Sequence, residues 1–323
     1  MTGAEVIIVG GGPAGSTCAW MLARAGKECL VLDAKMFPRV KPCAGWTSPQ
    51  VFETLGIAPG SYPHSLTRLD RIHFHLRGIR IPVATRQLAI RRWEFDDWLL
   101  RRAGVPVVQH RVREVARHDD GFVIDGRFRG RFVVGAGGTA CPVYRSLFAE
   151  AAPRSPASLV VAMEAELQCE PPDRECHLWF FDRGLPGYSW YLPKEGGFVA
   201  IGVGAIANQV GRTVGIRRHW EELLRRLARL GLEVGSECTP RGYAYHLRRG
   251  APVVQLGGAF LVGDAAGLAT VDMGEGIAAA VRSGALAAHA IATGAPYAVR
   301  SVPRYSIPSF VLSRHRGRRF WRS

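Results

Sequence analysis

The sequence of 323 residues lacks the markers of several common protein classes. Its seven cysteines have no regular spacing and include no CxxC pair, which excludes a zinc ribbon and argues against a secreted disulfide framework. Neither a G-x-S-x-G elbow nor a Walker loop occurs, so nothing indicates a serine hydrolase or a P-loop nucleotidase.

Long apolar segments are also scarce. The longest run without Asp, Glu, Lys or Arg covers residues 6–23, and its centre reads GGGPAG, which is typical of a turn rather than of a membrane-spanning helix. No basic segment precedes this run, as one would in a secretory signal. We therefore expect a cytoplasmic protein that is either soluble or bound to a membrane surface.

Acidic residues are few compared with basic ones. The sequence has 27 Asp and Glu residues and 42 Lys and Arg residues, which gives a formal charge of +15. Such an excess is either a solvated basic surface or an attraction to phosphates, anionic lipid or an acidic partner protein. No nucleic-acid-binding motif accompanies it, so we expect no nucleic-acid partner. Residues 300–323 mix Arg with aromatic and aliphatic residues, which suits either contact with an anionic membrane or packing on the protein's own domain.

The first 33 residues contain a strand–turn–helix–strand pattern. EVIIV (5–9) is typical of a buried parallel strand, GGGPAG follows at once, apolar residues at helical spacing cover 16–25, and CLVLD (29–33) is a second strand. In the turn, Gly10 permits the tight bend, Gly12 lets the backbone approach a pyrophosphate and Gly15 lets helix and strand pack closely. Asp33 ends the second strand, where it can bond ribose hydroxyls.

This combination predicts a dinucleotide site with its pyrophosphate at the start of the helix. The contacts expected here are Gly10, Gly12, Pro13, Ala14, Gly15, Asp33 and Ala34.

The rest of the chain mixes helices and strands. We expect a helix over 90–104 and alternating strands over 105–138, the last of which (RFVVGAGG) delivers a glycine-rich loop to the cofactor. Strand-rich, aromatic sequence follows over 157–204, then an amphipathic helix at about 214–230. Residues 259–291 predict a strand, a loop and a long Ala-rich helix.

Three segments together resemble the FAD-dependent oxidoreductases of the aromatic-hydroxylase type. They are the glycine motif, LVGDAAG…MGEGI (261–277), and Arg92-x-x-Phe95-Asp96 at the start of a helix. The resemblance implies that Asp264 bonds the ribityl chain of FAD and that Arg92 contacts its phosphate side. The other FAD contacts it implies are Val112, Gly135, Ala136, Gly137, Gly263, Gly274, Gly276 and Ile277.

Within that group the sequence most resembles the geranylgeranyl reductase family. PGYSWYLPK (186–194) is similar to its YxWxFP motif, and KPCAGW (41–46) to its KPCGG-type segment. The resemblance implies that Tyr188 and Trp190 line a substrate tunnel and that Cys43 lies near the flavin. It predicts transfer of a hydride from reduced FAD to a C=C bond of an isoprenoid or a similar apolar small molecule.

The fold implied is α/β. A Rossmann-like FAD-binding domain of the hydroxylase type is interleaved with a substrate domain on a mostly antiparallel sheet. We expect the FAD-binding domain in 1–60, 86–155 and 250–295, the substrate domain in 61–85 and 156–249, and a basic tail in 296–323. NAD(P)H or ferredoxin would donate electrons, and an acidic ferredoxin would suit the charge of +15.

Two other functions stay open. One is an FAD monooxygenase that hydroxylates an aromatic or polyketide-like substrate. The other is a flavin and dithiol electron-transfer protein that uses Cys43 and Cys141, whose thiols would be made reactive by nearby cations such as Lys41 and Arg145.

Two further features need an interpretation. Reduction of a C=C bond needs a proton, for which Tyr188 or bulk water are the candidates. His73 and His75 share one face of an expected strand, but no third ligand is evident, so we predict no metal site.

Overall fold

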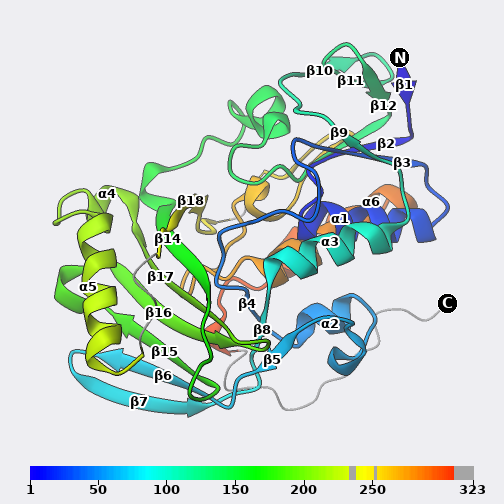
Figure 1. The fold of residues 1–323 in the computed structure, drawn as a ribbon. Coiled ribbons are helices and arrows are strands. Elements are labelled where there is room, and N and C mark those ends of the chain that lie inside the picture. The colour runs from blue at the N-terminus through cyan, green and yellow to red at the C-terminus, as the bar shows by residue number, and fades with distance from the viewer. Residues whose placement is uncertain (233–237, 251–252, 309–323) are drawn as a thin grey trace.

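The computed structural model describes residues 1–232, 238–250 and 253–308, and it contains two large sheets with helices on their faces (Figure 1). The first sheet is parallel except for its short edge strand β19. It runs in the order β19 (Gln255–Leu256), β20 (Ala259–Leu261), β13 (Phe132–Gly135), β2 (Val6–Val9), β3 (Cys29–Asp33) and β9 (Val107–Gln109). Its central strands are continuously apolar because both of their faces are buried.

Three helices belong to this half of the molecule: α1 (Pro13–Arg24), α3 (Arg92–Ala103) and α6 (Ile277–Thr293). Helix α1 contacts both of the others, and Gly284 of α6 has no room for a side chain because a Cβ atom would lie 2.2 Å from the Ala14 carbonyl oxygen. This close crossing holds the two glycine-rich segments of the sequence next to each other.

A small sheet flanks the parallel one. Its order is β1 (Thr2–Gly3), β12 (Phe128–Gly130), β11 (Gly121–Ile124) and β10 (Val115–His118). Strands β10, β11 and β12 come from the predicted alternating strands of 105–138, whereas β9 and β13 of that range belong to the parallel sheet.

The second large sheet is antiparallel except where β15 pairs with β6. It runs in the order β18 (Arg241–His246), β14 (Leu159–Gln168), β17 (Phe198–Ile206), β16 (Gly187–Lys194), β15 (Glu175–Phe180), β6 (Arg71–Leu76) and β7 (Ile79–Ala84). One face is covered by α5 (Ile216–Arg229), whose Trp220, Leu223 and Leu227 are buried against it, and α4 (Ala207–Val210) lies nearby. The other face is turned toward the parallel sheet and forms one wall of the cavity described below.

A fourth sheet, of three strands, connects the two halves. It consists of β4 (Trp46–Thr47), β8 (Leu88–Ile90) and β5 (Leu66–Arg68). The short helix α2 (Gln50–Thr54) packs against β8 in the same apolar cluster. The predicted fold class, a Rossmann-like FAD-binding domain interleaved with a mostly antiparallel sheet, is confirmed.

The first part of the predicted basic tail is held against the body. Arg248 donates to the Val302 carbonyl oxygen, and Asp272 accepts hydrogen bonds from the backbone N–H groups of Ser306 (2.8 and 2.9 Å) and Ile307 (2.8 Å). The Arg-rich remainder, 309–323, lies outside the described residues. Within the described ranges, no helix is long and apolar enough to cross a membrane.

Candidate functional site

One cavity of about 810 Å³ extends from the glycine motif to the inner face of the antiparallel sheet. At one end its wall contains Gly10, Gly12 and Asp33, at the carboxyl ends of β2 and β3. At the other end it contains Phe180 and Tyr188. The first end is where ligands bind in open parallel α/β sheets, and the second is apolar.

The glycine motif has the close packing that its sequence predicts. Gly10 has a φ of +111°, and a Cβ atom there would lie 2.4 Å from the Ala136 carbonyl oxygen. A Cβ atom on Gly15 would lie 1.9 Å from the Gly10 carbonyl oxygen, so Gly15 serves helix–strand packing. Helix α1 begins after Gly12 without a side-chain cap, which leaves its first N–H groups for an anion.

Asp33 is fixed by the same turn. Its Oδ2 accepts a hydrogen bond from the Gly11 N–H at 2.7 Å, and its Oδ1 accepts one from the Lys35 N–H at 2.9 Å. The carboxylate therefore stays at the end of β3, beside the cavity, in the position expected of a ribose-binding acid.

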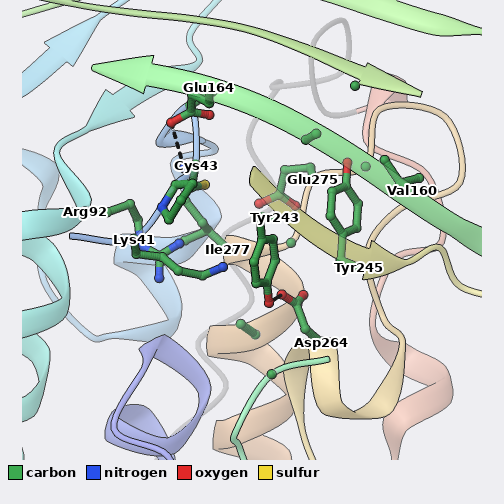
Figure 2. Close-up of a pocket in the computed structure, with 18 of the residues that line it drawn as sticks. Lys41, Cys43, Arg92, Val160, Glu164, Tyr243, Tyr245, Asp264, Glu275 and Ile277 are labelled. Atoms are coloured by element: carbon green, nitrogen blue, oxygen red, sulfur yellow. Dashed lines mark hydrogen bonds between the residues drawn. The ribbon is translucent and has the colours of Figure 1, made fainter. Parts of the chain in front are cut away.

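Lys41 places a buried amine nitrogen on the cavity wall. Its Nζ lies 2.6 Å from the centroid of the Tyr243 ring, and no hydrogen-bond partner reaches it within the described residues. Burial lowers the pKa of Lys41 to about 7, although Asp264 opposes this shift. Tyr243 donates to Asp264 Oδ2 at 2.8 Å, so the three side chains form one group on the cavity wall (Figure 2). An unpartnered ammonium group in this place fits an anionic cofactor.

The loop before α6 closes the same wall. Gly274 has a φ of +63°, and a Cβ atom there would lie 2.3 Å from the Tyr245 hydroxyl oxygen. Glu275 Oε1 accepts from the Ala278 N–H at 2.7 Å, which satisfies one amide at the start of the helix. Burial raises the pKa of the Glu275 carboxyl to about 7.

Glu164 and the Cys43 loop meet across the two halves of the molecule. The Cys43 N–H donates to Glu164 Oε1 at 2.7 Å, and Figure 2 shows this contact. Gly45 shapes the loop, because its φ is +74° and a Cβ atom would lie 2.0 Å from the Ile90 carbonyl oxygen. Glu164 is only 6% exposed. Burial raises its pKa to about 7, with Lys194 acting in the opposite direction.

Arg92 is held rigidly at the edge of the cavity. Its Nε and one terminal nitrogen bond the two carboxylate oxygens of Asp96 at 2.6 and 2.7 Å. Arg39 also approaches Asp96, at 3.4 Å. A fixed guanidinium of this kind can face a phosphate without first losing side-chain freedom.

Aromatic rings form the apolar end. Phe180 stacks on Tyr188 with 5.0 Å between ring centroids, and Trp190 lies 5.7 Å from Tyr188. The Tyr188 hydroxyl donates to the Met273 carbonyl oxygen at 2.5 Å, which ties β16 to the loop before α6. The Trp190 Nε1 is buried without a partner among the described residues, so this wall still offers one donor.

The cavity gathers most of the residues that the sequence singled out. Those that line it are Gly10, Gly12, Pro13, Ala14, Asp33, Ala34, Cys43, Arg92, Ala136, Gly137, Tyr188, Trp190, Gly263, Asp264, Gly274, Gly276 and Ile277. Four others lie behind the wall: Gly15, Val112, Gly135 and Cys141. Val112 belongs to the core while its neighbour Arg111 lines the cavity, and a Cβ atom on Gly135 would lie 2.7 Å from a Leu261 methyl carbon.

Cys141 differs from the expectation in one respect. Its side chain is 0% exposed, and burial raises the pKa of the thiol. The proposed lowering of this pKa by nearby cations is therefore wrong, because desolvation outweighs them. Both Cys43 and Cys141 are free thiols, and only Cys43 lines the cavity.

Two further possible metal ligands lie near the histidine pair, which the sequence did not indicate. Parallel pairing of β6 with β15 brings Glu175 and His177 beside His73, with possible ligand atoms within 4.8 Å of one another. Glu175 is already engaged, since it accepts from Arg71 at 2.7 Å and contacts His73 at 2.5 Å. This cluster is not part of the cavity wall.

Sequence reasoning missed four residues of the site: Glu164, Tyr243, Tyr245 and the anion-facing role of Lys41. A signal existed for Glu164, because an acid inside the apolar strand ASLVVAMEAEL is unusual. The two tyrosines belong to β18, which the RGYAYH segment did not predict as a strand.

The fit to FAD is supported by comparison with known proteins. Residues 3–65 match the FAD binding domain family. The chain is 31% identical over 312 residues to an uncharacterized protein of Methanosarcina barkeri, covering 90% of this chain and 74% of that one. It is 28% identical over 306 residues to the geranylgeranyl diphosphate reductase of Rhodobacter capsulatus, covering 88% and 74%.

The fold has a close match among solved structures. A geranylgeranyl bacteriochlorophyll reductase-like protein from Thermoplasma acidophilum superimposes with a TM-score of 0.78 over 90% of this chain and 78% of the other, at 20% identity. That identity supports a likeness of fold alone. The sequence relatives and the match to the FAD binding domain family show that this chain is an FAD-dependent oxidoreductase of the geranylgeranyl reductase family.

Proposed function

We propose that the protein reduces C=C bonds in the hydrocarbon chain of an isoprenoid. The observation that carries this proposal is the continuity of the cavity, which joins the FAD-type end directly to an aromatic wall. A long apolar chain can enter such a space, and its burial there is favourable at about 25 cal/mol per Å² of apolar surface removed from water. The relative named geranylgeranyl diphosphate reductase supports the same class of substrate.

When bound and reduced, FAD supplies a hydride. The residues that would hold it are those of the glycine end: Gly12 and Ala14 at the start of α1, Asp33 at the end of β3, Arg92, and Asp264. Tyr188 and Trp190 would orient the hydrocarbon and exclude water from it.

Glu164 is our candidate for the proton donor. The second carbon of the double bond needs a proton, and a general acid is most effective when its pKa lies near the working pH. The pKa of Glu164 is raised to about 7 by burial, and its carboxyl lines the cavity next to the Cys43 loop. The proton would pass from this carboxyl to the substrate carbon, and bulk water would restore it.

Tyr188 is less suited to that step than the sequence suggested. Its hydroxyl hydrogen is engaged with the Met273 carbonyl oxygen, and burial raises its pKa well above the usual 10. We therefore propose that Tyr188 shapes the tunnel and holds the loop before α6.

An anaerobic assay tests the proposed function. The FAD-loaded protein is reduced with dithionite, freed of excess reagent, and mixed without oxygen with geranylgeranyl diphosphate. We expect oxidation of the flavin and a product heavier by a pair of hydrogen atoms for each bond reduced. If the flavin stays reduced until oxygen is added, and oxygen is then consumed in proportion to an aromatic substrate, the protein is a monooxygenase instead.

The electron donor and the partner surfaces are separate proposals. NAD(P)H and a ferredoxin are compared by the rate at which each reduces the bound flavin, and the charge of +15 favours an acidic protein donor. Membrane contact through the Arg-rich segment is tested by sedimentation with vesicles containing phosphatidylglycerol.

A further inference from the structure

A second cavity of about 550 Å³ lies at one end of the antiparallel sheet. Three segments meet there: the turn between β6 and β7, the turn between β15 and β16, and the last turn of α5. In Figure 1 these lie on the side away from α1 and α6, at the edge where β6, β7 and α5 come together. It is therefore distinct from the FAD end of the first cavity.

The two cavities share two aromatic residues. Phe180 and Phe181 line both of them. Phe180 belongs to the apolar wall described above, whereas Phe181 is 61% exposed. A chain in the first cavity would therefore reach the second at Phe181.

The second cavity is strongly basic. Four arginines line it, Arg77, Arg183, Arg226 and Arg229, against a single acid, Asp182. His75 adds no charge at neutral pH, because burial and the neighbouring histidines and arginines lower its pKa to about 4. Guanidinium groups are suited to phosphate oxygens because they donate two parallel hydrogen bonds.

Two of these arginines have no acidic partner in the described part of the chain. Arg226 pairs with Asp182 at 2.7 Å, and Arg183 pairs with Glu222 at 3.3 Å. Among the residues that the structure describes, Arg229 has only the Arg225 carbonyl oxygen, at 3.2 Å, and Arg77 has no carboxylate within ion-pair distance. Both unpaired guanidinium groups remain available to an anion.

The turns that present these groups are unusual in their backbone. Three of the four non-glycine residues with positive φ in the described ranges lie on this cavity: Arg77 (φ 50°), Phe181 (φ 54°) and Arg183 (φ 47°). Non-glycine residues in this region cost free energy and persist where the surrounding structure demands them. They give the cavity its shape.

From the shared aromatic wall and the arginines beyond it, we propose that the second cavity binds the phosphate or diphosphate head of the substrate whose hydrocarbon chain lies in the first. The inference rests on the proposed function for the chain, and it adds the place where an anionic head of the substrate would bind. The phosphoryl group would come either from a soluble prenyl diphosphate or from the head of a membrane phospholipid.

The test compares binding of geranylgeranyl diphosphate with binding of the matching alcohol to the FAD-loaded, oxidised protein by calorimetry. The variant is Arg77→Gln with Arg229→Gln. The control is Arg212→Gln with Arg217→Gln, which removes the same charge from exposed residues near the start of α5. A second arm measures sedimentation with vesicles of phosphatidylcholine containing phosphatidylglycerol.

We expect the wild-type protein to bind the diphosphate more tightly than the alcohol. The variant should bind the diphosphate less tightly by about tenfold for each arginine removed, with alcohol binding and the control pair unchanged. Loss of vesicle binding alone would identify a phospholipid head as the source of the phosphate. Equal affinity for diphosphate and alcohol, or a variant that retains both diphosphate and vesicle binding, overturns the inference.

These results are separable from those for the proposed function. If a prenyl diphosphate binds in an arginine-dependent way but is never reduced, the phosphate site is supported and the proposed reductase function is rejected. If the variant instead reduces the substrate as fast as the wild type and binds it with the same affinity, the proposed reductase function stands and the phosphate site is rejected.

Discussion

Gly202 of β17 lies directly beneath the indole ring of Trp190 on β16. A Cβ atom on Gly202 would lie 2.1 Å from the ring, and one on Gly204 would lie 3.4 Å from it. The two strands pair with Trp190 opposite Gly202. The absence of a side chain at 202 therefore sets how deeply Trp190 sits in the sheet, and with it the width of the apolar end of the cavity.

Gly202→Ala should push Trp190 toward the cavity. We expect a loss of about 1–3 kcal/mol in the free energy of unfolding, as for other overpacked cores, together with weaker binding of long prenyl substrates. Urea denaturation and substrate titration measure the two effects. Gly60→Ala is the control, because a Cβ atom there meets nothing within 4 Å. Equal stability of the two variants would show that the indole ring has room to move.

Tyr188→Phe should affect stability more than chemistry. It leaves the Met273 carbonyl oxygen without its donor, which costs about 1–3 kcal/mol for a buried group. Tyr62→Phe is a matched control, since the buried Tyr62 hydroxyl has no partner among the described residues and its removal should be neutral. A loss of reduction without a loss of stability in Tyr188→Phe would restore the tyrosine as the proton donor.

The rate of reduction should depend on pH through Glu164. The acid is protonated below its pKa of about 7, so the rate for the prereduced enzyme should be level below that pH. Above it the rate should fall about tenfold per pH unit. Glu164→Gln should be slow and lack this pH dependence. Anaerobic single-turnover measurements across this range provide the check.

The control for that profile is Glu275, which also lines the cavity. Burial also raises the pKa of Glu275 to about 7, but its Oε1 caps α6 through Ala278. Glu275→Gln keeps an oxygen for that bond and should keep the pH profile. If the profile disappears in Glu275→Gln and persists in Glu164→Gln, the roles of the two carboxyls are reversed.

The parts of the site that the sequence predicted are local. Gly10, Gly15 and Asp33 lie within one strand–turn–helix–strand unit, where spacing alone determines which atoms meet. Asp264 and Gly274 were found through a motif of similar length. In each of these cases the predicted residue adjoins or lines the cavity because its own segment forms the wall.

The parts that were missed depend on pairing between distant segments. Glu164 meets the Cys43 loop across 121 residues, and Tyr243 reaches Asp264 only because β18 pairs with β14 at the edge of the second sheet. Glu175 and His177 join His73 in the same way, through β6 and β15. The order of strands in a sheet is not encoded in any one segment, so the chemistry that it creates is visible only in the structure.

Lys41→Met should have two effects, one on the pH dependence of apoprotein stability and one on the affinity for FAD. Burial holds the pKa of Lys41 at about 7, below its usual 10.5, so the unfolded chain binds this proton more strongly than the folded one. In the apoprotein, stability should therefore rise between about pH 7 and pH 10.5, and Lys41→Met should remove this rise.

The same substitution should weaken FAD binding, because the anionic cofactor loses a cation on the cavity wall. Thermal unfolding of the apoprotein and flavin fluorescence titration measure the two effects. Lys27→Met is the control, since Lys27 pairs with Glu5 at the surface at 2.8 Å. Unchanged FAD affinity in Lys41→Met would mean that the ammonium group serves something other than the cofactor.

A dithionite titration should count about two electrons per FAD, the capacity of the flavin itself. Cys141 is fully buried behind the wall that Cys43 lines, and burial raises the pKa of its thiol, which disfavours the reactive thiolate. Cys43→Ser should leave the count unchanged. About four electrons in the wild-type protein, falling to about two in Cys43→Ser, would require a dithiol–disulfide pair in exchange with the flavin.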